Sequence, residues 1–280
     1  MNFLITGGNG FLGREFNRVL SNTEHSVFLT NRDNLDVTKE NQVEDYFCDN
    51  NIDVVLHTAI KGGRRGKKVC FDEFVKNVLM FKNLQKQADR FKIMFTFGSG
   101  AAYDRTKVID DIEEHYIEKR IPIDYYGLSK NLIAREILKH NCNIINLRLF
   151  GCFGVSEDSE RFVKSAFFNI FNNKPIIVHQ DKKMDFFYVQ DLLNVIFYYI
   201  ENYNQNLPKD LNMCYGEKYT LKEVANIIKS LTKSETKVIL EKKDMGKPYT
   251  GSSQRLLDLP ILLNGFNEGL KQVYQELGEK

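Results

Sequence analysis

Hydrophobic residues in the first half of the chain form short runs, and between these runs they recur every three or four positions. The runs are too short for helices and predict buried strands, whereas the recurring spacing predicts amphipathic helices. The predicted strands are Phe3–Ile5, Ser26–Thr30, Val54–Leu56, Ile93–Phe97 and Asn143–Phe150, and the longest predicted helix is Phe71–Phe91. Alternation of this kind is typical of a parallel sheet between helices. We therefore predict an α/β fold with a Rossmann-type doubly wound parallel sheet.

The pattern changes character after residue 150. A predicted helix at Glu160–Asn172 is rich in aromatic residues, and another covers Thr220–Leu231, whose first residue is a plausible N-cap with Glu223 completing a capping box. No internal repeat or proline-rich linker separates the two parts. We predict a NAD(P)-binding Rossmann domain at residues 1–150 and a small, mainly substrate-binding lobe at residues 151–280 that is partly interwoven with it.

Composition excludes several classes of partner. A formal net charge of +2 over 280 residues gives no reason to expect nucleic acid or a membrane surface as the main partner. No apolar run approaches the length of a membrane-spanning helix. The five cysteines are scattered, without CxxC spacing or a disulfide framework, so we expect free thiols and a cytoplasmic location. We assign no metal ligands.

The most informative local motif is a glycine-rich turn near the N-terminus. Gly7, Gly10 and Gly13 follow the first predicted strand at three-residue spacing, and a helix begins with Phe11 and Leu12. Strand, glycine turn and helix together form the fingerprint of dinucleotide binding. Such glycines allow a tight turn, close approach of the backbone to a pyrophosphate, and close packing of the helix, whose N-terminus attracts the phosphates.

The end of the second predicted strand bears on the choice of cofactor. NAD-binding units commonly place an acidic residue there, but this chain has Thr30 and Asn31, followed by Arg32. An arginine suits the 2′-phosphate of NADP(H), which we favour, while NAD(H) stays possible. The alternative is that Arg32 is a solvated loop cation. Thr58 and Ala59, after the third strand, complete the expected cofactor contacts.

A basic, glycine-containing loop follows at Lys61–Lys68. Charged stretches of this kind are usually solvated. This one lies at the carboxyl end of a strand, where doubly wound sheets bind ligands. Contact with a substrate diphosphate, through Lys61 and Gly62, is therefore the second interpretation.

Tyr126 and Lys130 carry the candidate chemistry. They stand four residues apart in a predicted helix and so share one face. A lysine ammonium near a phenol stabilises the phenolate and lowers the tyrosine pKa, which lets tyrosine act as a general acid or base. Ser99, followed by Gly100, ends a neighbouring strand, where its hydroxyl can hold a substrate oxygen. With a nicotinamide and a carbonyl, this set is suited to hydride transfer.

The same spacing occurs a second time, in Tyr103 and Lys107. We place this pair in a polar loop that extends to Asp124 and predict that it has no catalytic role. Tyr-x-x-x-Lys alone is thus a weak signal, and it becomes informative only together with Ser99 and the dinucleotide turn.

Together these motifs resemble the extended short-chain dehydrogenase/reductases, the group of nucleotide-sugar epimerases, dehydratases and reductases. The resemblance covers nearly the whole chain and includes Thr6–Gly13, the Ser99 loop, Tyr126–Lys130, Leu147–Phe150 and Asp185–Leu192. It implies a nucleotide-diphosphate sugar as substrate. It also implies that Ser99, Tyr126 and Lys130 form the catalytic triad.

Further residues narrow the reaction that this resemblance implies. Dehydratases of the group carry an Asp-Glu pair after the triad hydroxyl, where this chain has Gly100 and Ala101. The segments Thr30–Asp36, Ile52–Val55 and Lys61–Gly63 look like the GDP-fucose synthase branch, which reduces a 4-keto sugar with NADPH. That branch also epimerises C3 and C5 with a cysteine, here Ala101, and a histidine that is missing between residues 157 and 166. The resemblance therefore implies a reductase without epimerase action.

Other positions depart from the family or leave alternatives open. Gly151 replaces a frequent asparagine, and Met184 replaces an arginine expected near the nucleotide. Arg161 and Arg255 are candidates for diphosphate contacts, because arginine forks suit phosphate, or else are surface arginines. The family's homodimer would form through the helices predicted at residues 71–91 and 126–140, unless one chain covers their apolar residues itself.

We predict an NADP(H)-dependent reductase of a nucleotide-linked 4-keto-(6-deoxy) sugar in nucleotide-sugar or surface-glycan biosynthesis. The first alternative is a C4 epimerase with permanently bound NAD. The second is a non-catalytic regulator that senses the NADP redox state. Such regulators have usually lost the tyrosine or the lysine, and this chain keeps both.

Overall fold

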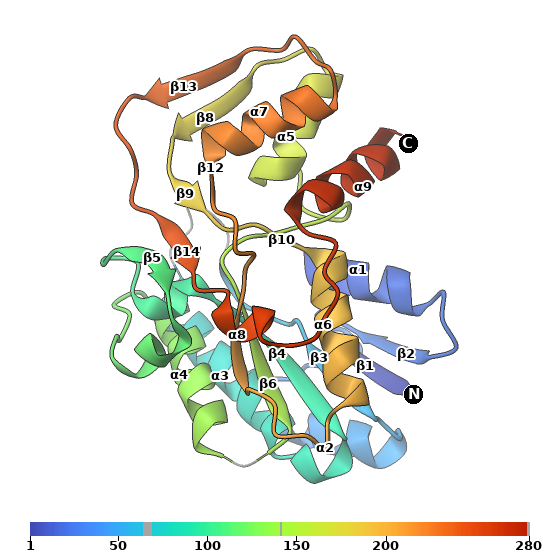
Figure 1. The fold of residues 1–280 in the computed structure, drawn as a ribbon. Coiled ribbons are helices and arrows are strands. Elements are labelled where there is room, and N and C mark those ends of the chain that lie inside the picture. The colour runs from blue at the N-terminus through green and yellow to red at the C-terminus, as the bar shows by residue number, and fades with distance from the viewer. Residues whose placement is uncertain (64–68, 141, 279–280) are drawn as a thin grey trace. The chain divides into compact units, whose positions relative to one another are not determined.

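The computed structural model of the protein describes residues 1–63, 69–140 and 142–278. The chain divides into two compact units, which are described separately below. Unit 1 comprises residues 1–107, 114–148 and 196–211, and unit 2 comprises residues 108–113, 149–195 and 212–280. The colour gradient in Figure 1 follows the chain through both units.

Unit 1 is built on a sheet of strands β1 (Asn2–Thr6), β2 (Ser26–Thr30), β3 (Val54–His57), β4 (Ile93–Ser99), β6 (Ile144–Leu149) and β11 (Asp210–Met213). Among the described residues these strands lie in the order β11-β6-β4-β3-β1-β2. Strand β1 pairs in parallel with both β2 and β3, and β3 pairs in parallel with β4. Chain order reverses between β1 and β3, so their carboxyl ends form the switch point at which doubly wound sheets bind ligands. The predicted fold class is confirmed.

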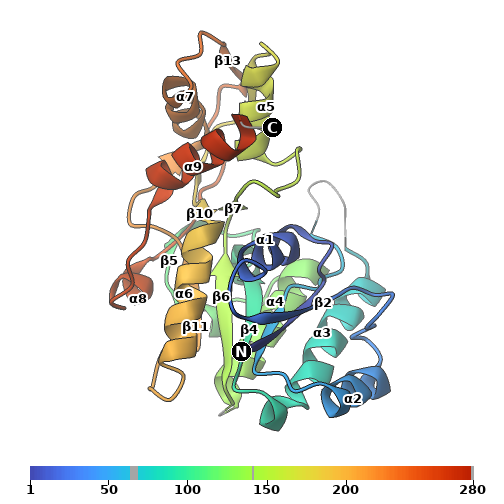
Figure 2. The same cartoon turned by 90° about the vertical axis from the view of Figure 1, so that its right-hand side faces the viewer.

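Helices α1 (Phe11–Leu20), α2 (Glu40–Asp49), α3 (Phe71–Gln85), α4 (Tyr125–Lys139) and the end of α6 (Val189–Glu201) pack on this sheet. Side chains alternate between the two faces along β4. On one face Phe97 contacts Phe16 of α1, with ring centroids 5.2 Å apart, and Phe95 contacts Tyr199 of α6 at 6.2 Å. Met94 points to the other face, where Figure 2 shows α2, α3 and α4 together.

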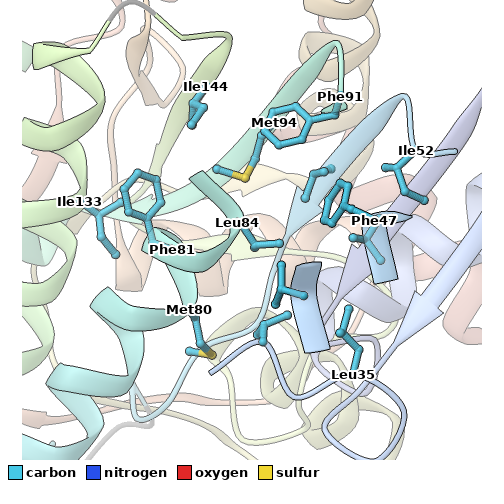
Figure 3. Packing of buried hydrophobic residues seen from close by; sticks show 14 of the residues in the cluster. Leu35, Phe47, Ile52, Met80, Phe81, Leu84, Phe91, Met94, Ile133 and Ile144 are labelled. Carbon is cyan, nitrogen blue, oxygen red and sulfur yellow. The ribbon is translucent and has the colours of Figure 1, made fainter. Parts of the chain in front are cut away.

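The core on that second face is a continuous apolar cluster (Figure 3). Phe81 and Leu84 of α3 lie close to Met94 of β4, Met80 extends the same cluster along α3, and Ile133 of α4 closes one side. Fully burying a side chain of this size contributes roughly 1.5–3 kcal/mol. Because α3 and α4 both pack on this cluster, their N-terminal ends are held in fixed positions over the carboxyl ends of the strands.

Unit 2 contains short sheets and helices from three chain segments. Its strands are β5 (Ile109–Ile112), β7 (Cys152–Phe153), β8 (Ile176–Gln180), β9 (Lys183–Met184), β10 (Phe187–Tyr188), β12 (Tyr219–Thr220), β13 (Val238–Lys242) and β14 (Tyr249–Gly251). Its helices are α5 (Phe162–Phe171), the start of α6, α7 (Leu221–Leu231), α8 (Gln254–Leu257) and α9 (Phe266–Gly278). Strands β12, β9, β14 and β5 form one sheet in that order, and β8 pairs in parallel with β13. The functional roles that we assigned to the two parts of the chain stay predictions.

Several predicted elements differ from the structure at their ends. The capping box of α7 is confirmed, because the Thr220 hydroxyl accepts from the Glu223 N–H at 3.1 Å and the Glu223 carboxylate accepts from the Thr220 N–H at 2.7 Å. The helix predicted to Phe91 was too long. It ends at Gln85, where the backbone bonds shorten to i+3 spacing and lead into a 3₁₀ turn, η1 (Ala88–Arg90).

The polar loop predicted to extend from Asp104 to Asp124 was also wrong in part. It contains the strand β5 and the 3₁₀ turn η3 (Glu114–Glu118), and the 3₁₀ turn η2 (Gly100–Tyr103) precedes it. The strand escaped prediction because its partner, β14, lies about half the chain away, and local alternation in four residues carries no trace of that pairing.

Candidate active site

The glycine turn lies between the carboxyl ends of β2 and β3. Gly7 has φ +73°, a left-handed conformation that favours glycine, and a Cβ there would lie 2.6 Å from the Cα of Ala59. The N–H of Gly8 donates to the Thr30 carbonyl at 2.7 Å, and the N–H of Gly10 donates to the Gly7 carbonyl at 2.9 Å. The predicted turn thus brings Gly7 against Ala59, a residue expected to contact the same cofactor.

The N-terminus of α1 is open to an anion. Its N-cap is Gly10, which has no side chain to accept from the first N–H groups, and its first turn contains no acidic residue. A Cβ on Gly13 would lie 2.6 Å from the Gly7 carbonyl oxygen, so the helix packs directly on the turn. A helix N-terminus in this setting binds phosphate through its N–H groups and its partial positive charge.

Arg32 lies in the loop after β2 and is largely exposed. Its Nε is 3.4 Å from the Asp36 carboxylate. Partial burial acts to raise the pKa of Asp36, but hydrogen bonds from Thr38 and the charge of Arg32 outweigh burial and lower it. The loop itself is fixed, because the Asn34 side chain accepts from the Asn31 N–H at 2.7 Å. Arg32 is therefore positioned by an ion pair and still accessible from solvent.

Ser99, Tyr126 and Lys130 all belong to unit 1. Ser99 is the last residue of β4, and its hydroxyl accepts from the Ala101 N–H at 3.2 Å. Tyr126 lies in the first turn of α4, which begins after the N-cap Asp124, and Lys130 follows one turn later. The Lys130 ammonium donates to the carbonyl of Phe97 at 2.6 Å, which ties α4 to β4 two residues before Ser99. Burial lowers the pKa of Lys130 to about 8.

A close backbone approach brings the start of α4 to the residues after Ser99. A Cβ on Gly127 would lie 2.5 Å from the carbonyl oxygen of Ala101 and 2.9 Å from Pro122. Only glycine fits this contact without moving the backbone. The neighbouring side chain, Tyr126, has Gly63 so close that a Cβ there would lie 2.9 Å from the Tyr126 ring. The candidate acid, the serine loop and the loop after β3 thus meet at one end of the sheet.

Asn77, a residue that our sequence reasoning missed, holds the loop after β3. It is buried in α3, and its side-chain oxygen accepts from the Lys61 N–H at 2.8 Å while its amide donates to the Lys61 carbonyl at 3.0 Å. Lys61 and Gly62 are thereby positioned next to Gly63, and Arg64, Arg65, Gly66, Lys67 and Lys68 lie outside the described residues. The sequence did contain a signal for Asn77, because it is a polar residue among the apolar positions of a predicted helix.

His57, at the end of β3, was also missed. It is buried, and the Thr6 hydroxyl lies 2.8 Å from its Nδ1. Burial, and secondly the charge of Lys130, lower the pKa of His57 to about 3, so the imidazole is neutral at physiological pH. His57 and Lys130 line the same small cavity.

The profile of the NAD dependent epimerase/dehydratase family matches residues 3–214 of this chain. The chain belongs to this family. The match spans the glycine turn, Ser99, Tyr126 and Lys130, and it confirms the resemblance seen in the sequence.

Three proteins illustrate the likeness. GDP-6-deoxy-D-talose 4-dehydrogenase from Aggregatibacter actinomycetemcomitans is 24% identical over 243 residues, which are 81% of this chain and 79% of that protein. A GDP-L-fucose synthetase from Naegleria fowleri bound to NADP superposes with a TM-score of 0.81 at 17% identity, over 99% of this chain and 94% of that one. A UDP-glucose 4-epimerase from Thermus thermophilus in complex with NAD superposes with a TM-score of 0.79 at 19% identity, over 99% of both chains. The two superpositions establish a shared fold.

Within this epimerase/dehydratase chain, the second tyrosine and lysine pair has a different environment. Tyr103 is fully buried in η2, and the guanidinium of Arg148 lies over its ring at 4.5 Å and donates to its hydroxyl. Arg148 is itself paired with both oxygens of Asp210, at 2.7 and 2.6 Å. Lys107 is exposed. Tyr103 thus lies in the core of unit 1 rather than in the polar loop that we predicted.

Arg161 and Arg255 belong to unit 2, so the structure does not group them with the residues above. Arg161 is the N-cap residue of α5, more than half exposed, with its Nε 3.8 Å from Glu157. Glu157 is buried, and burial raises its pKa to about 8. Arg255 lies in α8. Across the described parts of both units, no helix is long and apolar enough to cross a bilayer.

Proposed function

We propose that this chain is an NADP(H)-dependent reductase of a nucleotide-linked 4-keto-(6-deoxy) sugar. The observation that carries the proposal is the position of Lys130, whose desolvated ammonium is tied to the β4 backbone two residues from Ser99 and one helical turn from Tyr126. A bound nicotinamide supplies the hydride in this class of reaction. The residues of the chain have to hold the carbonyl oxygen and deliver the proton.

In this scheme Tyr126 is the general acid. Its hydroxyl donates a proton to the C4 oxygen as that oxygen becomes an alkoxide, and the Ser99 hydroxyl holds the same oxygen by a hydrogen bond. The Lys130 ammonium stabilises the phenolate that remains and thereby makes the tyrosine a stronger acid. Gly100 and Ala101 bring no acid or base to the next positions, which favours reduction over dehydration.

A dinucleotide fits the residues at the switch point. The open N-terminus of α1 suits a pyrophosphate, and Gly7, which packs closely on Ala59, brings no side chain to the turn. Arg32 favours NADP(H), because its exposed guanidinium can pair with a 2′-phosphate. The Naegleria protein was solved with NADP and the Thermus protein with NAD, so the fold accommodates either cofactor.

Two similar proteins of different kinds support C4 of the sugar as the carbon at which this chain acts. By their names, the Aggregatibacter protein is a 4-dehydrogenase of a GDP-6-deoxy sugar and the Thermus protein is a 4-epimerase of UDP-glucose. Both names place the chemistry at the same carbon, and the first favours a GDP-linked 6-deoxy sugar for the initial test.

The deciding experiment measures absorbance of the reduced nicotinamide with a panel of 4-keto-6-deoxy nucleotide sugars, each made in place by a known dehydratase. We expect stoichiometric oxidation of NADPH with one member, which also identifies the nucleotide. No net oxidation, but a sugar isomer by NMR, would indicate the C4 epimerase with retained NAD. Cofactor binding without either result across the panel would favour the NADP-sensing regulator.

The cofactor preference has its own test. Arg32→Ala should raise the KM for NADPH roughly tenfold, as expected for one lost phosphate contact, and leave the KM for NADH unchanged. Arg90→Ala is the control, because Arg90 is an exposed arginine at the opposite end of β4. Equal changes with both cofactors would refute 2′-phosphate recognition by Arg32.

We also propose a homodimer formed through α3 and α4. Val75, Leu79 and Leu132 are about 40% exposed on these helices, and a groove of about 360 Å³ between the helices has Val78 and Phe81 in its lining. Light scattering should give twice the chain mass, and Leu132→Lys should give the monomer.

The free cysteines among the described residues suit a reducing compartment, in line with our proposal of a cytoplasmic enzyme.

A further inference from the structure

A small cavity with both polar and apolar lining residues lies beside Lys130 in unit 1. Its polar lining comes from five elements: His57 of β3, Asn77 of α3, Thr96 of β4, Lys130 of α4 and Asn146 of β6. Its volume is about 10 Å³, which is close to the room that one water molecule needs, and its polar side chains provide the partners that a buried water requires.

The hydrogen bonds of Thr6 determine which nitrogen of His57 carries the proton. The Thr6 hydroxyl is buried and has two neighbours, the Nδ1 of His57 at 2.8 Å and the N–H of Ala59 at 3.4 Å. Since the Ala59 N–H is a donor, the hydroxyl hydrogen has to be donated to Nδ1, or a buried donor is left unpaired. His57 is therefore neutral with its proton on Nε2, and its ring lines the cavity.

The cavity then holds two donors that need a common acceptor. One of the three N–H groups of the Lys130 ammonium donates to the Phe97 carbonyl at 2.6 Å, so the other N–H groups can donate into the cavity. The amide oxygen of Asn77 accepts from the Lys61 N–H and has a second lone pair. The Asn146 amide donates to Asp210 at 2.6 Å, and its oxygen lies 3.3 Å from the Thr96 hydroxyl. A water that accepts from Nε2–H and Lys130 can donate to these amide oxygens.

We propose that His57 is a positioning residue of the active site, which holds the Lys130 ammonium in place through one water molecule shared between them. The water keeps the ammonium solvated inside the protein, so His57 sets the pH range over which Lys130 stays charged. The consequence for turnover rests on the proposed function, but the effect on Lys130 itself does not.

The other charged groups near Lys130 are not placed to hold its ammonium through a shared water. Of the residues that line the cavity, His57 and Lys130 are the titratable ones, and the other polar lining residues, from α3, β4 and β6, are two neutral amides and a hydroxyl. Tyr126 lies one turn before Lys130 in α4, and Asp210 accepts from the amide of Asn146. Burial and the charge of Lys130 lower the pKa of His57 to about 3, so at physiological pH it acts by hydrogen bonding and not by its own titration.

The test is NMR of the purified full chain without substrate, so it succeeds or fails independently of the reductase assay. Long-range ¹H–¹⁵N spectra should show His57 neutral and protonated on Nε2. The titration midpoint of Lys130, followed at its ¹³Cε and assigned with Lys130→Met, should fall by about one pH unit in His57→Phe, because the ring without nitrogen no longer holds the water. His57→Asn should restore the midpoint, since its amide can accept from Thr6 and donate into the cavity.

Two results would overturn the proposal. One is a Lys130 midpoint in His57→Phe equal to that of the natural protein, and the other is a His57 ring protonated on Nδ1. If His57→Phe does not fold, Thr6→Val serves in its place, because it removes the hydroxyl that selects the tautomer and keeps the side-chain volume. It should give a mixture of His57 tautomers and a smaller shift of Lys130 in the same direction, and an unchanged tautomer would again contradict the proposal.

Discussion

Two tyrosine and lysine pairs with identical spacing have different surroundings in unit 1. Tyr126 and Lys130 lie on one face of α4, and the lysine is tied to β4 at the Phe97 carbonyl. Tyr103 and Lys107 do not share a face, because η2 ends at Tyr103 and the next residue, Asp104, has a φ of +66° that interrupts the helical path. Spacing of four residues predicts contact only inside a continuous helix.

The surroundings of the two tyrosine and lysine pairs differ as much as their backbone conformations. The hydroxyl of Tyr103 is held by the Arg148 guanidinium in the core, whereas Lys107 is exposed, so the pair has neither a reachable phenol nor a desolvated ammonium. Lys130 is buried, and burial lowers its pKa to about 8. The comparison teaches that the lysine's surroundings, more than the motif, separate the proposed catalytic pair from the pair in the core.

The largest contrast should come from removing the two hydroxyls. Tyr126→Phe should lower kcat by about 10³-fold, within the range of general acid catalysis, and leave NADPH affinity nearly unchanged. Tyr103→Phe should keep the turnover number and instead lower the free energy of unfolding by about 1–3 kcal/mol, because a buried hydrogen bond to a charged group is lost. Steady-state kinetics and urea unfolding of both variants separate these effects. Full activity in Tyr126→Phe would refute the proposed mechanism.

Replacing the two lysines should give a smaller difference in kcat than replacing the two tyrosines. Lys130→Met should lower kcat by roughly 10²-fold, since the phenolate loses its counter-charge, while Lys107→Met should resemble the natural protein. The natural enzyme should also lose activity as pH rises through about 8, because the ammonium of Lys130 then deprotonates. Lys130→Met should show no fall at that pH. A pH–rate profile for each variant checks this, and a shared alkaline limb would place the titrating group elsewhere.

The smallest effect concerns Asp124, the N-cap residue of α4. The Asp124 side chain accepts from the Gly127 N–H at 2.9 Å and pairs with Arg105 at 2.8 Å. Asp124→Ala removes this N-cap and should cost about 1 kcal/mol, or a fall in Tm of about 2 °C. Asp124→Asn keeps an N-capping oxygen and should lie close to the natural protein in the same thermal scan. Equal losses in both variants would show that the charge, and not the cap, is what matters.

The residues that could be predicted from the sequence are those whose signal is local. The glycine turn, the start of α4 and the capping box at Thr220 each occupy a few consecutive positions, and each rests on backbone geometry that those positions alone determine. The short apolar runs of β1, β3 and β4 could be recognised equally well, because strands buried on both faces are built mostly of apolar residues.

The parts that escaped prediction depend on partners distant in the chain. Strand β11 reads Asp210-Leu211-Asn212-Met213, which does not look apolar, yet all four residues are buried. Asp210 tolerates burial because Arg148, 62 residues earlier, pairs with it. His57 depends in the same way on Thr6, and Asn77 on Lys61. Hydrophobic periodicity cannot reveal a polar side chain whose burial is compensated elsewhere.

The pairing of β5 with β14 has a consequence for how the chain is made. The side chain of Thr250 accepts from the backbone of Asp111 across 139 positions, so the first strand of this sheet leaves the ribosome long before its partner. At synthesis rates of about 5–20 residues per second the interval is on the order of ten seconds. During that time β5 is an unpaired edge, open to chaperones or to a neighbouring nascent chain. Yield in cells should therefore respond to translation speed and temperature more than the stability of the finished fold would suggest.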